Sequence, residues 1–418
     1  MRQQYIIAKN GRGIATNQAK NNQLVKKTIS FIIILVVGAT LASGQIINRI
    51  DGTTITADSL RNRIQYLMKT ANVTGLAVCV FNNNQPIFSH TFGLADVKKK
   101  VPLEPSSVMY AASLSKLVFS YLVMQLVAEK RLDLDRPLVS YLDSSLVDYK
   151  MNKGGGYQDL KNDDRYQKIT ARMCLSHTTG FPNFRELTPD KKLRIITDPG
   201  SRYRYSGEGI ELLQFVIEKI TGKDYETLAE ERVFKPLYMG STSQVWQKRF
   251  EEHICYGYNA KGKPYPLFKR DEANAAGSMS TTLEDFTKFY TALIGNQGIT
   301  QQNFEEMTRK QVAIRSKRQF GPLAAKDGPD NDAIALGYGL GVGVFKTPYG
   351  EAFFKEGHGN GWQHYTICYR EKKIALIIMT NSDNGESIFK ELLAVAIGDV
   401  FTPWQWENYI PYDKKMDK

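Results

Sequence analysis

The sequence predicts an α/β protein of the α+β kind, in which both ends of the chain build one antiparallel sheet flanked by helices. Two hairpin patterns carry this prediction, one over residues 76–92 and one over 364–380. The chain between them is dominated by helical apolar spacing and loops. We therefore expect sheet parts at about residues 55–112 and 335–401, with a mostly helical lobe, about 113–334, inserted between them.

The composition is that of a folded globular protein. Apolar residues make up 42% and charged residues 23% of the 418, and four Cys are too few for a disulfide-stapled scaffold. The formal net charge is +12, but residues 1–27 contain six Lys or Arg and no acid. The remaining excess is spread along the chain, so it does not predict a nucleic-acid partner.

The first 44 residues have the order of a secretory signal. A basic stretch ending at Lys27 precedes an apolar run over 29–37 and a series of small residues ending at Gly44. The run is shorter than the ~18 residues of a membrane span. We expect export to the periplasm or cell exterior, with residues 1–44 a cleaved signal peptide or, through 28–43, a membrane anchor.

Residues 45–418 are expected to form a single domain. Near its start, helical spacing of apolar residues predicts a helix over Asp58–Ala71. Strands Leu76–Phe81 and Pro86–Phe92 follow, around an Asn-rich turn. Leu114–Glu129 is apolar and contains no Gly or Pro, which predicts a buried helix.

The lobe and the C-terminal part carry their own signals. A helix over Ile210–Ile220 is expected to end at Gly222, and Thr281 with Glu284 forms a capping box before another helix. Glycine alternates with larger residues from Gly337 to Val344, which predicts a strand with one bare face that another element can approach. Strands 364–369 and 374–380 and a helix over 387–400 complete the chain.

Several kinds of site are excluded. The chain has no phosphate-binding loop, no H-E-x-x-H, no C-x-x-C, no G-x-G-x-x-G and no G-x-S-x-G elbow. The five His are not at metal-ligand spacing. We expect neither a metal nor a cofactor.

Ser113 and Lys116 form an S-x-x-K segment at the start of the predicted buried helix. Residues three apart share a helix face, so the ammonium can lie beside the hydroxyl and favour its alkoxide. The helix N-terminus favours negative charge at the same place. Ser387 and Lys390 match the same pattern, but there we expect a helix N-cap followed by a surface Lys.

Two further segments carry polar groups next to turns. Tyr205 follows a Pro-Gly turn and precedes a helix, and a phenol beside an ammonium can act as a general base. His358 lies in a glycine-rich stretch ahead of a predicted strand, where backbone N–H groups can approach a ligand. Taken singly, each segment also fits an ordinary packing Tyr or a tight loop.

Together these segments resemble the serine β-lactamase-like hydrolases, the branch with class C β-lactamases, D-alanyl-D-alanine carboxypeptidases and β-lactamase-like esterases. Ser113-x-x-Lys116 matches the first family motif, and Tyr205-Ser206-Gly207 stands where the family has Y-x-N. His358-Gly359 stands where it has K-T-G or H-x-G. The resemblance covers about residues 55 to 400 and implies a β-lactamase/transpeptidase-like fold.

The resemblance also implies an acyl-enzyme mechanism with Ser113 as nucleophile and Lys116 and Tyr205 moving the proton. The Ser113 N–H and an N–H near His358 would stabilise the oxyanion. The surrounding substrate-binding and oxyanion residues are expected to be His358, Gly359, Asn360, Gly361 and Gly207.

The resemblance leaves the substrate open. Gly207 lacks the amide of the family's Asn, which favours an ester or a D-amino-acid amide or peptide over a β-lactam. A class C-like β-lactamase, a penicillin-binding D,D-carboxypeptidase and a non-hydrolytic penicillin-binding sensor stay as alternatives. We expect a small-molecule ester, a β-lactam or a peptidoglycan-type peptide as partner and no nucleic acid. The oligomeric state is left open.

Overall fold

The computed structural model describes residues 44–149 and 156–414. The chain divides into two units, Met1–Ile46 and Ile47–Lys418, and the sheet and helices below belong to the second. The predicted targeting segment, except Gly44, lies outside the described residues.

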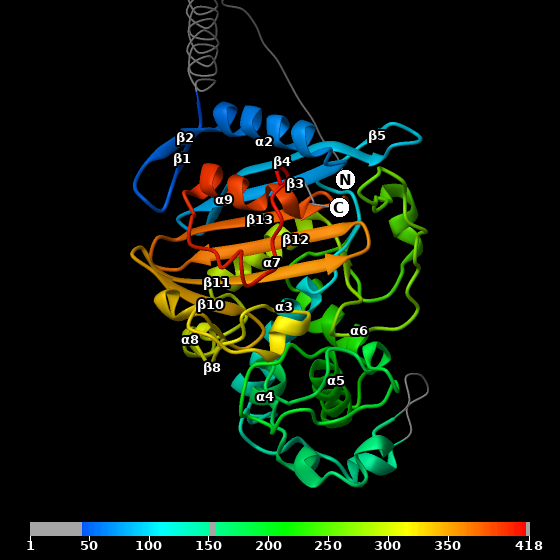
Figure 1. The fold of residues 1–418 in the computed structure, drawn as a ribbon. Helices are drawn as coiled ribbons and strands as arrows, with labels where there is room; N and C mark the ends of the chain where they lie inside the picture. The colour runs from blue at the N-terminus through cyan, green and yellow to red at the C-terminus, as the bar shows by residue number, and fades with distance from the viewer. Residues whose placement is uncertain (1–43, 150–155, 415–418) are drawn as a thin grey trace, which may run out of the picture. The chain divides into compact units, whose positions relative to one another are not determined.

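A nine-stranded antiparallel sheet is the centre of the second unit (Figure 1). Its strands in chain order are β3 Gly75–Asn82, β4 Gln85–Asp96, β5 Val101–Pro102, β8 Val312–Ala313, β9 Gly337–Tyr338, β10 Gly343–Thr347, β11 Gly350–Gly359, β12 Trp362–Tyr369 and β13 Ile374–Thr380. In space the order is β5-β4-β3-β13-β12-β11-β10-β9-β8. The remaining short strands are β1 Ile46–Asn48, β2 Thr54–Thr56, β6 Met109–Tyr110 and β7 Ser280–Thr281.

The pairing of β3 with β13 joins the two ends of the chain in one sheet. Its register runs from Leu76 opposite Thr380 to Asn82 opposite Ile374. This confirms the predicted fold class, because residues far apart in sequence become neighbouring strands. One detail differs, since β8 comes from the stretch that was assigned to the helical lobe.

Helices cover both faces of the sheet. Those in the described residues are α2 Ala57–Ala71, α3 Leu114–Ala128, α4 Ala171–Leu175, α5 Gly207–Thr221, α6 Tyr225–Ala229, α7 Leu283–Ile294, α8 Gln301–Thr308 and α9 Phe389–Ile397. On β3, alternate side chains face opposite ways. Leu76, Val78 and Val80 belong to the cluster that includes α2 and α9. Ala77, Cys79 and Phe81 belong to the cluster that includes α3 and α7.

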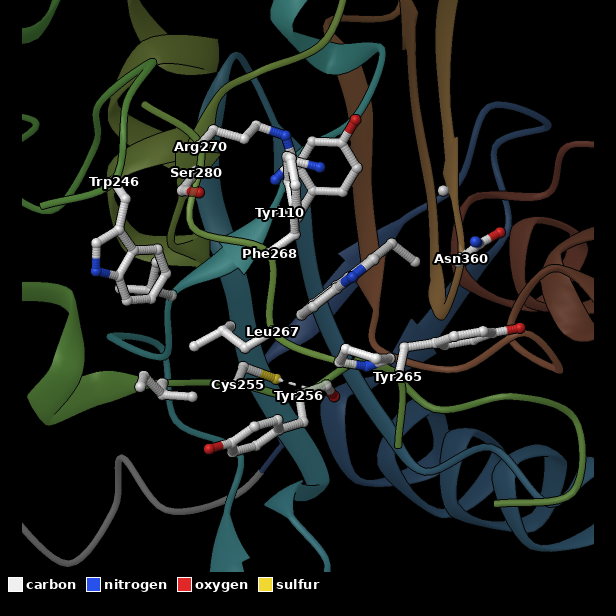
Figure 2. Close-up of a pocket in the computed structure, with 16 residues that line it drawn as sticks. Tyr110, Trp246, Cys255, Tyr256, Tyr265, Leu267, Phe268, Arg270, Ser280 and Asn360 are labelled. Carbon is white, nitrogen blue, oxygen red and sulfur yellow. Dashed lines mark hydrogen bonds between the residues drawn. The ribbon is translucent and has the colours of Figure 1, made fainter. Parts of the chain in front are cut away.

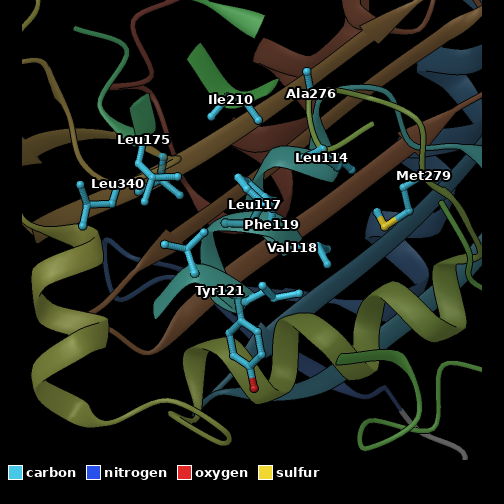
Figure 3. Packing of buried hydrophobic residues seen from close by; sticks show 14 of the residues in the cluster. Leu114, Leu117, Val118, Phe119, Tyr121, Leu175, Ile210, Ala276, Met279 and Leu340 are labelled. Carbon is cyan, nitrogen blue, oxygen red and sulfur yellow. The ribbon is translucent and has the colours of Figure 1, made fainter. Parts of the chain in front are cut away.

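Helix α3 is buried on nearly all sides between the sheet and the lobe (Figure 3). Leu117, Val118 and Phe119 are fully buried. A helix with apolar residues all around can only be stable in such a place. Its first turn carries the S-x-x-K segment, so the fold places that segment between the sheet and the lobe.

The glycine-rich stretch before the C-terminal hairpin is two strands rather than the single predicted one. It forms β9 and β10, which pair with each other around a bend. The expected close approach does occur: a Cβ on Gly341, whose φ is +84°, would lie 1.9 Å from Ser120 Oγ of α3. Glycine is therefore required where the bend meets the central helix.

Candidate active site

Ser113 lies at the junction between β6 and α3. It forms the N-cap of the helix, and Ala112 before it has a positive φ of 48°. A non-glycine residue in this conformation marks local backbone strain. The turn leaves Ser113 half-buried at the wall of a pocket of about 330 Å³.

Lys116 follows one helical turn later and reaches back to the hydroxyl. Its Nζ donates to Ser113 Oγ at 3.1 Å and also to the carbonyl oxygen of Ala276. The side chain is only 1% exposed. Burial lowers the pKa of Lys116, because a low-dielectric surrounding disfavours the charged form. The ammonium therefore gives up its proton more readily than a surface Lys.

Tyr205 approaches Ser113 from the lobe. It precedes Ser206, the N-cap of α5, and its hydroxyl donates to Ser113 Oγ at 3.0 Å. Burial by itself raises the pKa of this phenol, but the ammonium groups of Lys116 and Lys355 lower it below its ordinary value. The phenol is thus more acidic than that of an ordinary Tyr.

His177 packs against Tyr205. Its ring lies 4.3 Å from the Tyr205 ring, centroid to centroid, and its Nδ1 accepts the Ser206 N–H at 3.2 Å. The side chain is fully buried. Burial and the nearby lysines lower the pKa of His177 well below its ordinary value, so the imidazole is neutral.

Lys355 of β11 was not singled out in the sequence, yet it contacts this group directly. Its Nζ is 3.4 Å from Tyr205 Oη and 3.0 Å from Glu356 Oε1, and both β11 side chains are buried. Burial lowers the pKa of Lys355, but the Glu356 carboxylate outweighs this effect and raises it. The available signal was the K-x-G spacing of Lys355-Glu356-Gly357, three residues before the expected position.

His358 lines the Ser113 pocket, but its side chain contacts Glu386. Its Nε2 lies 3.0 Å from Glu386 Oε1, and the side chain is 35% exposed. Partial burial lowers the pKa of His358, while the Glu386 carboxylate raises it by more. The imidazole is therefore directed to Glu386 rather than to Tyr205.

The three residues after His358 do not all line the same pocket. Gly359 and Asn360 line a neighbouring pocket, while the Gly361 N–H donates to Asp383 Oδ1 at 2.6 Å. Because that N–H is already engaged, Gly361 is a poor oxyanion donor. Among the residues expected around the oxyanion, this contact disfavours Gly361 as the second donor.

The register of β11 turns the His358 N–H away from β12. Arg370 N donates to Glu351 O, so odd-numbered residues of β11 make the ladder bonds with β12. Even-numbered residues face β10, whose pairing with β11 stops at Phe354. The His358 N–H therefore points to the open edge. The start of α3 is close there, since a Cβ on Gly357 would be 2.9 Å from Ala111 O.

Gly207 lies at the first turn of α5 and is buried. Its N–H donates to the side-chain oxygen of Asn183 at 3.1 Å. An amide side chain therefore lies beside the Tyr205-Ser206-Gly207 segment, but it comes from a different loop.

Two pockets share part of their lining in this region. Figure 2 shows the larger of these two. The nucleophile pocket, about 330 Å³, contains Ser113 and His358. The second pocket, about 550 Å³, is rich in aromatic side chains and includes Trp246 and Trp362. We call it the hairpin pocket, because Gly359 and Asn360 at the turn between β11 and β12 also line it. Three residues line both: Tyr110, Phe268 and Arg270.

Within residues 44–149 and 156–414, no three His, Cys, Asp or Glu side chains gather where they could hold a metal ion. No helix in this part of the chain is long and apolar enough to cross a membrane.

Comparison with known proteins adds the family. The Beta-lactamase family model matches residues 60–397. Penicillin-binding protein 4* of Bacillus subtilis is 25% identical over 348 residues, covering 74% of this chain and 68% of that protein. Protein flp of Staphylococcus aureus is 24% identical over 241 residues, 53% of this chain and 46% of that protein. This chain thus spans about half the length of the Staphylococcus relative.

Two solved structures share the fold. The octameric penicillin-binding protein homologue from Pyrococcus abyssi has a TM-score of 0.63 at 20% identity, covering 81% of this chain and 76% of that one. The D-alanine carboxypeptidase AmpC from Burkholderia cenocepacia also has a TM-score of 0.63, at 18% identity, covering 82% of this chain and 100% of that one.

Proposed function

The chain belongs to the beta-lactamase family and is a serine hydrolase, and we propose that it works through an acyl-enzyme on Ser113. One observation carries the proposal. Ser113 Oγ lies 3.1 Å from Lys116 Nζ and 3.0 Å from Tyr205 Oη, both buried groups. A hydroxyl held between an ammonium and a phenol, each with a lowered pKa, is an activated nucleophile.

In the proposed reaction the Ser113 hydroxyl attacks the carbonyl carbon of the substrate. When Tyr205 is ionised, its phenolate oxygen, 3.0 Å from Ser113 Oγ, takes the hydroxyl proton. That proton then passes to the leaving group. Water attacks the ester formed on Ser113, and the free acid leaves with the hydroxyl restored. Lys116 and Lys355 stabilise the ionised form of Tyr205 before it takes that proton.

The oxyanion is proposed to form between two backbone N–H groups. One is that of Ser113 at the start of α3, for which no acceptor is found among the described residues. The other is that of His358, which points to the open edge of β11 and lines the same pocket. Two N–H donors aimed at one point stabilise charge that develops there.

The substrate is proposed to be an ester or a D-amino-acid amide or peptide. Gly207 has no side chain with which to hold a substrate amide. In Lys355-Glu356-Gly357, Glu356 takes the middle place of the K-T-G pattern, and its carboxylate is already paired with Lys355. A β-lactam carboxylate therefore finds no hydroxyl donor from that side chain. A buried polar group left unmatched costs about 1–3 kcal/mol.

A second candidate is a penicillin-binding D,D-carboxypeptidase or a class C-like β-lactamase. The observation in its favour is the names of the similar proteins, a penicillin-binding protein and a D-alanine carboxypeptidase. A non-hydrolytic penicillin-binding sensor on the same fold would acylate without turnover.

The test is turnover of the purified chain on nitrocefin, short p-nitrophenyl esters and D-amino-acid peptides. We expect hydrolysis of the esters and weak or no turnover of nitrocefin. Nitrocefin turnover that matches the best ester would favour the second candidate instead. Stable acylation of Ser113 without release would indicate the sensor.

We also propose that the protein is exported and that its mature form begins near Gln45. The order of basic, apolar and small residues before Gly44 supports this. Mass spectrometry of the protein from cell fractions tests it. A cytoplasmic species that begins at Met1 would contradict export, and an exported species that retains residues 28–43 would indicate the anchor.

A further inference from the structure

We propose that Arg270 binds a carboxylate on the acyl part of the substrate, so that the preferred substrates are esters or amides of acids with a second, anionic end. This inference rests on the proposed hydrolase function of Ser113. It adds the substrate class, which that function leaves open.

The first argument is the position of Arg270. It lines both the nucleophile pocket and the hairpin pocket. Figure 2 shows it next to Tyr110 and Phe268, at the place where the two pockets share their lining. An acyl chain attached to Ser113 and extending toward the hairpin pocket would run along the shared lining, of which Arg270 is the charged member.

The second argument is how the guanidinium is held. Its central carbon lies 3.6 Å from the centroid of the Tyr110 ring and 5.0 Å from that of Phe268. The Arg270 carbonyl oxygen accepts the Trp246 N–H at 2.6 Å, which anchors the backbone. A guanidinium held against aromatic rings still has its N–H donors in its own plane, where they can bind a carboxylate through two parallel bonds.

The third argument is charge. Among the described residues, no carboxylate lies within ion-pair distance of Arg270, whereas Lys269 beside it pairs with Glu251 at 2.6 Å. Arg270 is only partly exposed, and this burial lowers its pKa. A desolvated cation without a counter-charge is costly, so a bound anion has more to gain here than at a solvated Arg.

Two acids also line the nucleophile pocket, Asp271 and Glu272, and they define the rival hypothesis. If they were free to receive substrate, an ammonium would bind there. Neither is free, because each is engaged in an interaction of its own. Arg270 is therefore the favoured site, and preference for a cationic substrate is the outcome that would overturn the proposal.

The experiment compares three p-nitrophenyl esters of similar length. They are the mono-p-nitrophenyl ester of adipic acid, its neutral methyl ester, and the cationic 6-aminohexanoate ester. We expect the full-length enzyme to favour the anionic over the neutral ester by about 10- to 100-fold in kcat/KM, mostly through KM, as for a charge-assisted hydrogen bond. Added salt should reduce the preference.

Variants then assign the preference. Arg270→Gln should bring kcat/KM for the anionic ester close to that for the neutral ester, and Arg270→Lys should keep part of the preference. Arg249→Gln is the matched control, because Arg249 also lies over an aromatic ring, Phe250, but lines neither pocket. It should leave the preference unchanged.

The outcomes separate this inference from the proposed function. Turnover of the neutral ester with no anionic preference, with a cationic preference, or with a preference that Arg270→Gln leaves intact would overturn the role of Arg270 alone. Absence of turnover on every ester, with no labelling of Ser113, would contradict the hydrolase itself. If Arg270→Gln does not fold, the partial loss in Arg270→Lys decides.

Discussion

The molecule contains two S-x-x-K segments, and their surroundings differ completely. In the first, Ser113 begins a buried helix and Lys116 Nζ lies 3.1 Å from its hydroxyl. In the second, Ser387 lies in a 3-10 turn before α9, where its hydroxyl donates to the Asn384 carbonyl oxygen at 2.6 Å. Lys390 is exposed on the surface.

The comparison shows that the spacing alone does not make a reactive serine. Both segments place Ser and Lys three apart, but only the first brings a phenol to the hydroxyl, with a second buried ammonium beside that phenol. The structure also corrects one expectation about the second segment. Ser387 is not a helix N-cap, because α9 begins after Ile388 and receives no side-chain cap.

The largest expected difference between the segments is at the serines. Ser113→Ala should remove covalent labelling by a fluorophosphonate and lower turnover by about 10⁴-fold or more, because no other hydroxyl lies between Lys116 and Tyr205 in the described chain. Ser387→Ala should keep both. The measurement is mass spectrometry of the labelled peptides together with ester turnover, and a label on the Ser387 peptide would reverse the assignment.

The lysines should differ next. Lys116→Met keeps the apolar volume in the buried site but removes the ammonium, so kcat/KM should fall by about 10²- to 10⁴-fold. Lys390→Met should leave kcat/KM within about twofold, since that side chain is exposed. The thermal unfolding temperature of both variants shows whether a fall in kcat/KM comes from the missing ammonium or from a destabilised fold. Equal effects of the two substitutions would mean that burial does not distinguish the segments.

A third difference concerns pH, because only the first segment has Lys355 nearby. Lys355 lowers the pKa of Tyr205 more than Glu356 raises it. Removing both charges in Lys355→Met/Glu356→Gln should raise that pKa, so the acidic limb of the kcat/KM profile should move to higher pH. Glu356→Gln alone should move it to lower pH. A limb that stays in place in both variants would exclude Tyr205 as the titrating group.

The smallest effect involves the second segment through Glu386, the residue before Ser387. The Glu386 carboxylate raises the pKa of His358. The ion pair therefore stabilises the fold fully at a pH below the ordinary His pKa of about 6.5, and this stabilisation is lost as the pH rises through the raised pKa. With 35% exposure and solvent screening, we expect only a few tenths of a kcal/mol. His358→Gln should therefore lower the unfolding temperature slightly at pH 5.5 but not at pH 8.5.

The same distinction between local pattern and packing applies to the fold. Hairpins and helices with strong periodicity were predictable, as α2 and the β12–β13 pair show. The exact residue at which a helix begins was harder to predict. Thr282 is the N-cap of α7, because its side chain accepts the Asp285 N–H, and it lies one residue after the predicted Thr281. The glycine-rich strand is broken because Gly341 has to meet Ser120 of α3, a contact from 221 positions away in the sequence.

By itself the sequence determined the elements, the antiparallel sheet from both chain ends and the three residues Ser113, Lys116 and Tyr205 as candidates. Helical spacing sets the first pair, since residues three apart share a face. Only the tertiary structure decided that Lys355, rather than His358, reaches Tyr205, because side chains alternate along β11 and a shift of three residues changes both the position and the face. Burial decided the rest: the same ammonium group is perturbed at Lys116 and solvated at Lys390, and burial depends on which distant segments pack against it.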